Sequence, residues 1–319
     1  MVKPILEWES RLGRRVKLRD LHILSTVVQW GSMAKGAAHL GMSQPSVSQA
    51  IAGLEAALRV RLLDRSPSGV EPTIYARALL KRGHVVFDEL KQGIRDIEFL
   101  ADPTVGEVRM GCPESMTAGF VPAILDRVSR HNPHIVVHVV NAQTVEQELR
   151  ELRERRVDLM MGVLLRPLAN DDVNIEVLCR DEHVVAAGTH SQWARRRKIE
   201  LSELMSERWI LFPSDALVTS YLAKAIATKG WEMPRASVTS FSFHVRMQLL
   251  STGRFLTIML GSVLRHNAER WSLKALPVDL GTPPVPISLV TLKNRTLSPV
   301  VEHLIGHIRE VATSMAKIR

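Results

Sequence analysis

The segment from Leu40 to Leu58, "LGMSQPSVSQAIAGLEAAL", constrains the fold more than any other part of this 319-residue chain. Its apolar residues return at helical spacing, at Val47, Ile51, Leu54 and Leu58. Ser43 stands ahead of them as an N-cap, and Pro45 falls in the first turn, where its missing N–H costs no hydrogen bond. The opposite face is polar but uncharged, with Gln44, Ser46, Ser48 and Gln49. Short hydrogen-bonding side chains of this kind suit the base edges and phosphates of DNA.

The preceding segment, "SMAKGAAHLG", predicts a second helix directly before the first. Ser32 is its expected cap, and Gly41 falls where a left-handed residue ends a helix. Two helices joined by "GMS" predict a helix-turn-helix, in which the second helix enters the major groove. The alternative is a helical hairpin in the small domain of an enzyme, because pairs of helices joined at a glycine also occur there. The polar, uncharged face favours DNA binding.

From Leu18 to Thr73 the sequence resembles the N-terminal domain of LysR-type transcriptional regulators. The resemblance is carried by "SQPSVS", by the "IAGLE" that follows, and by "LLDRSPSGVEPT", which is similar to the family's "LFxRxxxGxxLT" wing. The chain departs from the family pattern at four positions. Arg59 stands where the family usually has Gly, Leu63 replaces Phe, Pro72 replaces Leu, and Gln49 occupies a position that is often basic.

The resemblance implies a regulator that reads an interrupted palindrome in double-stranded DNA and responds to a small-molecule effector. The expected DNA contacts are Ser43, Gln44, Pro45, Ser46, Ser48 and Gln49, with Arg65 and Ser66 of the wing reaching phosphates. A long linker helix would pair two copies, giving a homodimer or homotetramer. RNA polymerase is a candidate further partner.

The charge distribution agrees with this reading. The chain carries a net charge of +9, of which +7 lies in residues 1–85, beside the helix-turn-helix. A DNA-binding domain joined to a domain of another kind should show this asymmetry. A basic surface without a role would not explain why charge and motif coincide. Aromatic residues make up only 5% of the chain, which disfavours base stacking on single-stranded nucleic acid.

The sequence predicts a protein of the bacterial cytoplasm with no membrane partner. No apolar run approaches the ~20 residues that a membrane span needs. The first residues, "MVKPILEWES", include acidic side chains and lack the apolar core of a signal peptide. Cys112 and Cys179 are either a redox-sensing pair or two buried thiols in a reducing compartment, and the second interpretation is favoured.

We expect a multidomain α/β protein with four parts. Residues 1–17 form a basic extension, either a tail or a loosely docked helix. Residues 18–72 form the winged helix-turn-helix. Residues 73–103 read as one long helix with an apolar seam that needs a partner, made of Leu79, Val86, Leu90, Ile94, Ile97 and Leu100. Residues 104–319 form the effector-binding domain.

Strands and helices alternate after residue 104, which indicates parallel sheets with right-handed crossovers. This many units suits two α/β lobes. The resemblance implies a periplasmic-binding-protein-like domain, with lobe I at 104–173 and 282–319 and lobe II at 174–281.

Ligands of such sheets bind beyond the carboxyl ends of strands, often at helix N-termini whose free N–H groups favour anions. The residues expected there are Ser115, Met116, Thr117, Thr144, Ser214, Phe243 and His244. Each hydroxyl taken alone could be a plain N-cap. Because the helix N–H groups and hydroxyls at these positions form a donor-rich, electropositive site, the sequence predicts a small organic anion as effector.

Other chemistry has little support. The segment "HIVVH" places His134 and His138 about 13 Å apart along a strand, too far for one metal ion. No GxSxG, GxGxxG, P-loop or CxxC motif occurs. The basic run "ARRRK" at 194–198 could bind phosphate or form a solvated face, and the solvated face is favoured. We therefore expect no catalytic residue, no metal and no cofactor beyond the unidentified effector. The rival interpretation is an α/β enzyme or solute-binding protein with a helical N-terminal appendage.

Overall fold

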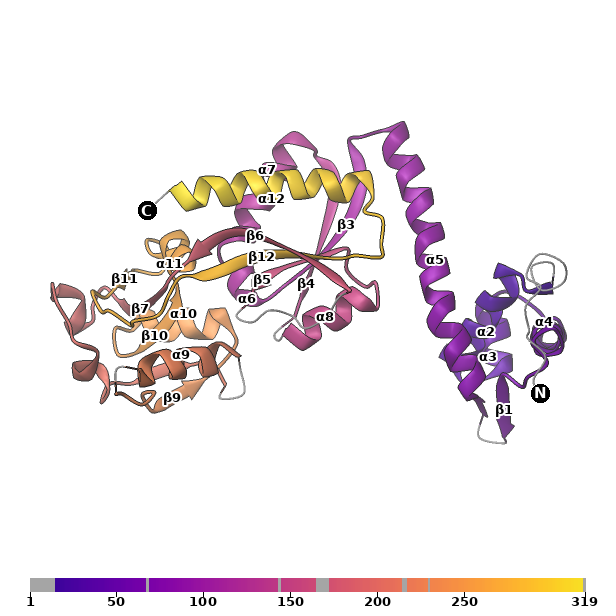
Figure 1. Cartoon of the computed structure of the whole chain (residues 1–319), viewed down its shortest axis with the longest axis horizontal. Coiled ribbons are helices and arrows are strands. Elements are labelled where there is room, and N and C mark those ends of the chain that lie inside the picture. Colours follow the sequence, from indigo (N-terminus) through magenta and orange to yellow (C-terminus); the bar gives the residue numbers. More distant parts are fainter. Residues whose placement is uncertain are drawn as a thin grey trace. The chain divides into compact units, whose positions relative to one another are not determined.

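The computed structural model describes residues 15–66, 69–142, 145–164, 172–213, 217–228 and 230–317 (Figure 1). The chain divides into two compact units, residues 1–91 and 92–319. The division falls inside one long helix.

The first unit is a winged helix-turn-helix. It contains α2 (Leu18–Trp30), α3 (Met33–His39) and α4 (Gln44–Leu58), followed by the antiparallel strands β1 (Leu63–Ser66) and β2 (Gly69–Pro72). The predicted caps are confirmed: Ser32 Oγ accepts from the Lys35 N–H, and Ser43 Oγ accepts from the Ser46 N–H. One apolar core joins the helices to the wing; among its fully buried members are Ile23, Leu24, Val27, Val47, Ile51, Leu54 and Leu62.

Two contacts fix the wing against the helices. The Glu55 carboxylate near the end of α4 accepts hydrogen bonds from the backbone N–H groups of Leu62 and Leu63, at 2.7 and 3.2 Å. The carbonyl of Gly31, which ends α2, accepts from the Val70 N–H at 2.9 Å. A Cβ at Gly69 would lie 2.6 Å from that carbonyl oxygen, so only glycine fits there.

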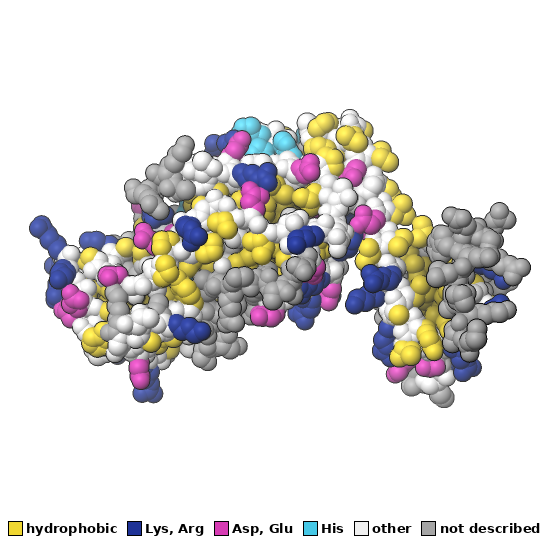
Figure 2. Space-filling model, viewed as in Figure 1, with side chains coloured by type: hydrophobic (Ala, Val, Ile, Leu, Met, Phe, Trp, Pro, Cys, Tyr) yellow, Lys and Arg dark blue, Asp and Glu magenta, His cyan; other side chains and the backbone are white. Residues whose placement is uncertain are grey.

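The predicted long helix is confirmed as α5 (Ile74–Ala101). Its first turns belong to the core of the first unit, where Ala76 and Leu80 are buried and Leu79 is partly buried. Further along, five members of the seam are 44–72% exposed: Val86, Leu90, Ile94, Ile97 and Leu100. Figure 2 shows hydrophobic side chains along this helix.

The second unit holds two five-stranded sheets. The first has the order β4-β3-β5-β12-β6, made of β3 (Val105–Cys112), β4 (His134–Asn141), β5 (Leu159–Val163), β6 (Val173–Asp181) and β12 (Val285–Leu292). Helices α7 (Phe120–His131) and α12 (Pro299–Lys317) pack on one face, and α8 (Val145–Arg153) packs on the other (Figure 1).

The second sheet has the order β11-β7-β10-β8-β9. Its strands are β7 (His183–Gly188), β8 (Trp209–Leu211), β9 (Ala236–Thr239), β10 (Leu256–Leu260) and β11 (Leu273–Ala275). Its helices are α9 (Leu217–Ala227), α10 (Phe243–Ser251) and α11 (Gly261–Asn267), with short 3-10 turns η2 (Gln192–Arg195) and η3 (Leu201–Leu204).

The expectation of purely parallel sheets is wrong. Strands β3, β4 and β5 are parallel, as are β8, β9 and β10, but β12 and β6 pair antiparallel, as do β7 and β10. The reason is that β6 leaves the first lobe and β12 returns to it, and the two pair from Val173↔Leu292 to Asp181↔Val285. The first lobe therefore extends to Asp181 rather than 173, and resumes at β12 rather than at 282.

Other differences are local. A separate short helix, α6 (Glu114–Thr117), precedes α7, and Gly119 is the N-cap position of α7. Helix α11 and strand β11 were not predicted. In the part of the chain that the structure describes, no helix has the length and hydropathy to cross a membrane.

The cysteines fit the interpretation as buried thiols. Cys112 has no exposed surface and packs in the core, and neither cysteine forms a disulfide. Burial raises the pKa of the Cys179 thiol to about 11, and the Asp181 carboxylate adds to this. Little reactive thiolate therefore forms at Cys179 at neutral pH.

Candidate nucleic-acid interface and ligand site

Helix α4 separates its packing face from its polar face. Val47, Ile51 and Leu54 are at most 1% exposed. The other side is open to solvent: Ser43, Gln44, Pro45, Ser46 and Gln49 are exposed and Ser48 is half-buried. The Ser43 and Ser46 hydroxyls lie 2.8 Å apart. The first two turns thus present amide and hydroxyl groups that play no part in the core.

The wing places the other two predicted DNA contacts at the end of β1. Arg65 and Ser66 are both exposed there. The Ser66 hydroxyl donates to the Gly69 carbonyl at 3.4 Å across the turn. Residues 67 and 68, at the tip, lie outside the described residues. An exposed arginine on a projecting hairpin has the reach and charge to meet a phosphate.

The expected ligand residues of the first lobe lie in α6, directly after β3. Ser115 and Thr117 are half-buried. The Thr117 hydroxyl donates to the Glu114 carbonyl at 2.7 Å, so one of its hydrogen bonds is used within its own turn. Met116 has no exposed surface and packs in the core, which leaves its expected role in ligand contact unsupported. Thr144 and Ser214 lie outside the described residues.

A carboxylate joins α6 to α10 of the second lobe. Ser242 caps α10 by accepting from the Val245 N–H, and the next backbone N–H, that of Phe243, donates to Glu114 Oε1 at 2.8 Å. The two predicted segments therefore do meet. His244 is exposed and stands edge-to-face with Trp271, with 5.5 Å between ring centroids.

Arg246, which sequence reasoning missed, lies buried one turn into α10. Its side chain is 4% exposed; Nη2 donates to Thr257 Oγ1 at 2.9 Å and to the Ile258 carbonyl at 2.7 Å. The guanidinium carbon lies 4.1 Å from the centroid of the Phe212 ring, and Phe212 follows the carboxyl end of β8. Nε has no hydrogen-bond partner.

Arg246 keeps its charge in this position. Burial lowers its pKa to about 10, and the Glu114 carboxylate opposes the shift, so the group is protonated at neutral pH. The only sequence signal was a basic residue beside the apolar residues Met247 and Leu250 in a short helix. Within the described ranges, no group of three His, Cys, Asp or Glu side chains is arranged to hold a metal ion.

Further buried polar contacts tie the two lobes. Asn267 Nδ2, at the end of α11, donates to the Ala118 carbonyl of the first lobe at 2.6 Å and to the Val263 carbonyl at 2.8 Å. The Asp181 carboxylate, at the end of β6, accepts from the backbone N–H of Ser262 in α11. The residues around α6 and α10 are therefore also part of the contact between the lobes.

Comparison with known proteins gives one family over nearly the whole chain. Residues 18–77 match the family described as "Bacterial regulatory helix-turn-helix protein, lysR family", and residues 101–313 match the "LysR substrate binding domain". The regulator GbpR of Azospirillum brasilense is 23% identical over 97% of this chain and 90% of its own length. The regulator TdcA of Escherichia coli is 24% identical over 93% of this chain and 94% of its own length.

Solved structures show the same fold. Full-length CbnR in complex with its target DNA is 20% identical, covers 93% of this chain and 100% of its own, and has a TM-score of 0.65. Full-length BenM is 19% identical, covers 94% of this chain and 97% of its own, and has a TM-score of 0.54. The interpretation as an enzyme or solute-binding protein is not favoured, because these relatives are transcriptional regulators. The chain belongs to the LysR family of transcriptional regulators, with an N-terminal DNA-binding helix-turn-helix and a C-terminal substrate-binding domain.

Proposed function

We propose that this regulator reads its operator with the exposed face of α4 and anchors itself on phosphates with the wing. Ser43, Gln44, Pro45, Ser46, Ser48 and Gln49 face the major groove, and Arg65 and Ser66 reach the backbone. The supporting observation is that these side chains are solvent-accessible while the opposite side of α4 supplies the core. Glutamine amides can pair with adenine by two hydrogen bonds, so we expect adenine in the half-site.

We further propose that the effector is a small organic anion bound where α6 meets α10. The observation that carries this proposal is Arg246, a buried cation whose Nε has no hydrogen-bond partner among the residues that the structure describes. The N-terminus of α10 already holds one carboxylate, that of Glu114 on the Phe243 N–H. A ligand carboxylate suits the same environment, with Ser115 and Thr117 on the first lobe and Phe243 and His244 on the second. Thr144 and Ser214 remain part of this proposal.

Binding there would act on the arrangement of the lobes. The Glu114–Phe243 and Asn267–Ala118 hydrogen bonds both join one lobe to the other. A ligand that competes with Glu114 for the Phe243 N–H binds more tightly when the Glu114–Phe243 hydrogen bond is broken than when it is formed. That difference is what allows a ligand to shift a conformational equilibrium.

The exposed residues of α5 support assembly through this helix. Five apolar side chains along one helix, from Val86 to Leu100, need a partner surface, and a second copy of α5 supplies one. The protein then works in the cytoplasm as a homodimer or homotetramer on double-stranded DNA, with RNA polymerase as a further partner. Leu90→Glu should divide the assembly into smaller species in sedimentation velocity experiments. An unchanged sedimentation coefficient would show that the helix does not pair.

Two experiments test the proposed function on the full-length chain. A gel shift with the intergenic DNA beside the gene should give a specific complex, and no shift over competitor DNA would exclude operator binding there. A thermal-shift screen should include organic anions, cations and neutral metabolites, because a ligand that binds the folded state raises its melting temperature. Stabilisation by anions should be lost in Arg246→Met. Stabilisation by cationic or neutral compounds alone would overturn the anion proposal.

A further inference from the structure

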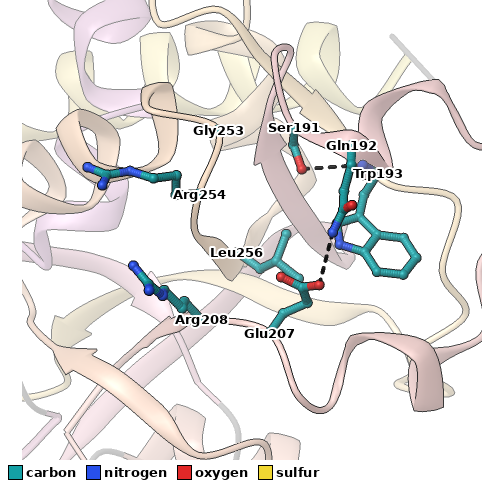
Figure 3. Close-up of a pocket in the computed structure, with 8 residues that line it drawn as sticks. All are labelled: Ser191, Gln192, Trp193, Glu207, Arg208, Gly253, Arg254 and Leu256. Atoms are coloured by element: carbon teal, nitrogen blue, oxygen red, sulfur yellow. Dashed lines mark hydrogen bonds between the residues drawn. The ribbon is translucent and has the colours of Figure 1, made fainter.

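A second candidate ligand site lies at the other end of the second sheet. A pocket of about 520 Å³ opens where β8 and β10 begin (Figure 3). Arg208 directly precedes β8, and Arg254 stands two residues before β10. The effector site proposed above depends on Arg246, whose guanidinium packs on Phe212 after the carboxyl end of β8. The pocket is therefore a different place on the same lobe, and nothing in the proposed function uses it.

The floor of the pocket is formed by two tightly packed turns. Gly253, with φ of 73°, ends the turn after α10, and a Cβ there would lie 3.1 Å from the backbone nitrogen of Ser191. A Cβ at Gly188 would lie 2.4 Å from the Leu250 carbonyl oxygen. Backbone packed this closely on backbone leaves little room for movement. The pocket is a fixed feature of the lobe.

Two arginines on one side of the pocket have no acidic partner. Arg208 and Arg254 are exposed and extend from neighbouring strand starts on the side away from Trp193 (Figure 3). Among the described residues, neither forms an ion pair or a side-chain hydrogen bond. Glu207, which also lines the pocket, instead accepts a hydrogen bond from Gln192 Nε2 at 3.2 Å. Because the Gln192 amide is neutral, the Glu207 carboxylate keeps its charge, and the two arginines leave the lining with one net positive charge.

A donor on the opposite side also lacks a partner. Trp193 Nε1 is buried and has no hydrogen-bond acceptor. Leaving such a buried donor unpaired is energetically unfavourable. Figure 3 shows the nitrogen-bearing edge of the indole beside Gln192 and Glu207, on the pocket side. A ligand oxygen that takes the place of the Gln192 amide beside this nitrogen would supply the missing acceptor (Figure 3).

The basic run at 194–198 directly follows Trp193 in the chain, although none of its residues lines the pocket. Within it Arg196 lies 5.7 Å from the centroid of the Trp193 ring and pairs with Glu203, and Lys198 pairs with Glu200. Most of its side chains are exposed, as a solvated face would be. The run nevertheless adds positive charge to this lobe, which attracts anions.

We propose that this pocket binds a small anionic metabolite through a phosphate or carboxylate group. Arg208 and Arg254 hold the anionic oxygens, and Trp193 Nε1 donates to a ligand oxygen on the opposite side. The regulator then takes two ligands, with the second bound at the amino ends of β8 and β10. Binding in this pocket does not depend on the effector site proposed beside Arg246.

Isothermal titration calorimetry on the full-length chain tests the site, with inorganic phosphate and citrate as probes and sodium chloride at matched ionic strength as the reference. We expect saturable binding of at least one probe, which identifies the preferred anionic group. The double substitution Arg208→Gln and Arg254→Gln should weaken that binding about tenfold or more. Trp193→Phe, which keeps the ring and removes the N–H, should weaken it less. The control Arg235→Gln removes an exposed arginine outside the pocket and should change nothing.

A second readout locates the bound anion. With ¹⁵N-labelled tryptophan, the Trp193 indole signal is identified by its loss in Trp193→Phe and should shift as the probe saturates. Arg246→Met should leave the titration intact, which separates this site from the proposed effector site. Absence of saturable binding, an equal loss of affinity in Arg235→Gln, or an unchanged Trp193 signal at saturation would each overturn the proposal.

Discussion

The two units of this protein bury different kinds of side chains. Among the described residues of the first unit, Thr26 is the only buried polar side chain, and its hydroxyl donates to the His22 carbonyl within the same helix. The second unit buries Asp158, Asp181, Arg246 and Arg295, together with several neutral polar residues. The first unit keeps its functional groups on the surface of an apolar core. The second unit places charged groups inside, where they serve both packing and the candidate ligand site.

This difference determines whether a substitution can change function without changing stability. On α4 the residues that support the fold and the residues proposed to read DNA are on opposite faces. Around α6 and α10 the same residues, Glu114 and Arg246, hold backbone groups of the protein and form the candidate site. Function should therefore be separable from stability in the first unit and coupled to it in the second.

The largest expected effect is the loss of a buried ion pair in the second unit. Arg295 Nη2 donates to Asp158 Oδ1 at 2.8 Å, with both side chains at most 4% exposed, and Asp158 Oδ2 accepts from the Arg109 N–H. Asp158→Ala removes a buried counter-charge of Arg295 and should cost about 3–5 kcal/mol. Differential scanning calorimetry should show a lower melting temperature for the effector domain.

The control for this prediction is Arg153→Ala. Arg153 and Asp172 form an ion pair at 2.7 Å, but their side chains are 39% and 42% exposed. Solvent screens this pair, and its loss should cost at most about 1 kcal/mol. Equal destabilisation by the two substitutions would show that burial of charge does not distinguish the second unit.

The next effect is a loss of stability in acid. Burial lowers the pKa of His183 to about 4 from its ordinary 6.5, and the nearby Asp181 carboxylate only partly opposes this. Below pH 6.5 the imidazole of His183 is protonated in the unfolded chain, whereas in the folded protein it is protonated only below about pH 4. Stability should fall across this window by about 3 kcal/mol, at about 1.4 kcal/mol per pH unit.

His183→Phe should flatten this acid limb relative to the unaltered protein, because the variant has no imidazole to protonate. The measurement is urea unfolding of both proteins at a series of pH values. The difference between their unfolding free energies isolates the contribution of His183 from that of the carboxylates, which titrate in both proteins. Parallel pH profiles would mean that His183 does not contribute to acid sensitivity.

On α4 we expect function to change without stability. Gln49→Ala removes an exposed amide and should relax discrimination at one base pair in each half-site, by about 1–3 kcal/mol. The melting temperature of the first unit should hardly move, since exposed substitutions stay within about 0.5 kcal/mol. Competition gel shifts with single-base operator variants measure the first effect. A marked loss of stability, or unchanged discrimination at every position, would contradict the separation of faces.

The same contrast explains what the sequence could predict. Helix α4, its cap Ser43 and the exposed glutamines depend on residues within a few positions of one another, and local period and capping were sufficient to place them. The site around α6 and α10 depends on contacts between distant residues: Phe243 and Glu114 are 129 positions apart, and Asn267 and Ala118 are 149. Hydroxyls after strands pointed to two segments that the structure brings into contact, but no local pattern indicated that Arg246 would be buried with charge. The antiparallel pairing of β6 with β12 was missed for the same reason.

The smallest expected effect concerns Arg59, at the position where the family usually has glycine. The residue ends α4 with φ of 56° and ψ of 31°, a left-handed conformation that a side chain disfavours. Arg59→Gly should stabilise the first unit by about 1 kcal/mol, although the greater freedom of glycine in the unfolded chain reduces the gain. Arg59→Ala removes the charge but keeps the Cβ, so it should give no such gain. Urea unfolding of the three proteins decides the matter, and equal midpoints for all three would show that this turn is not strained. Because Arg59 is exposed at the end of the helix proposed to read DNA, a loss of affinity common to both variants would show that its charge contributes to DNA binding.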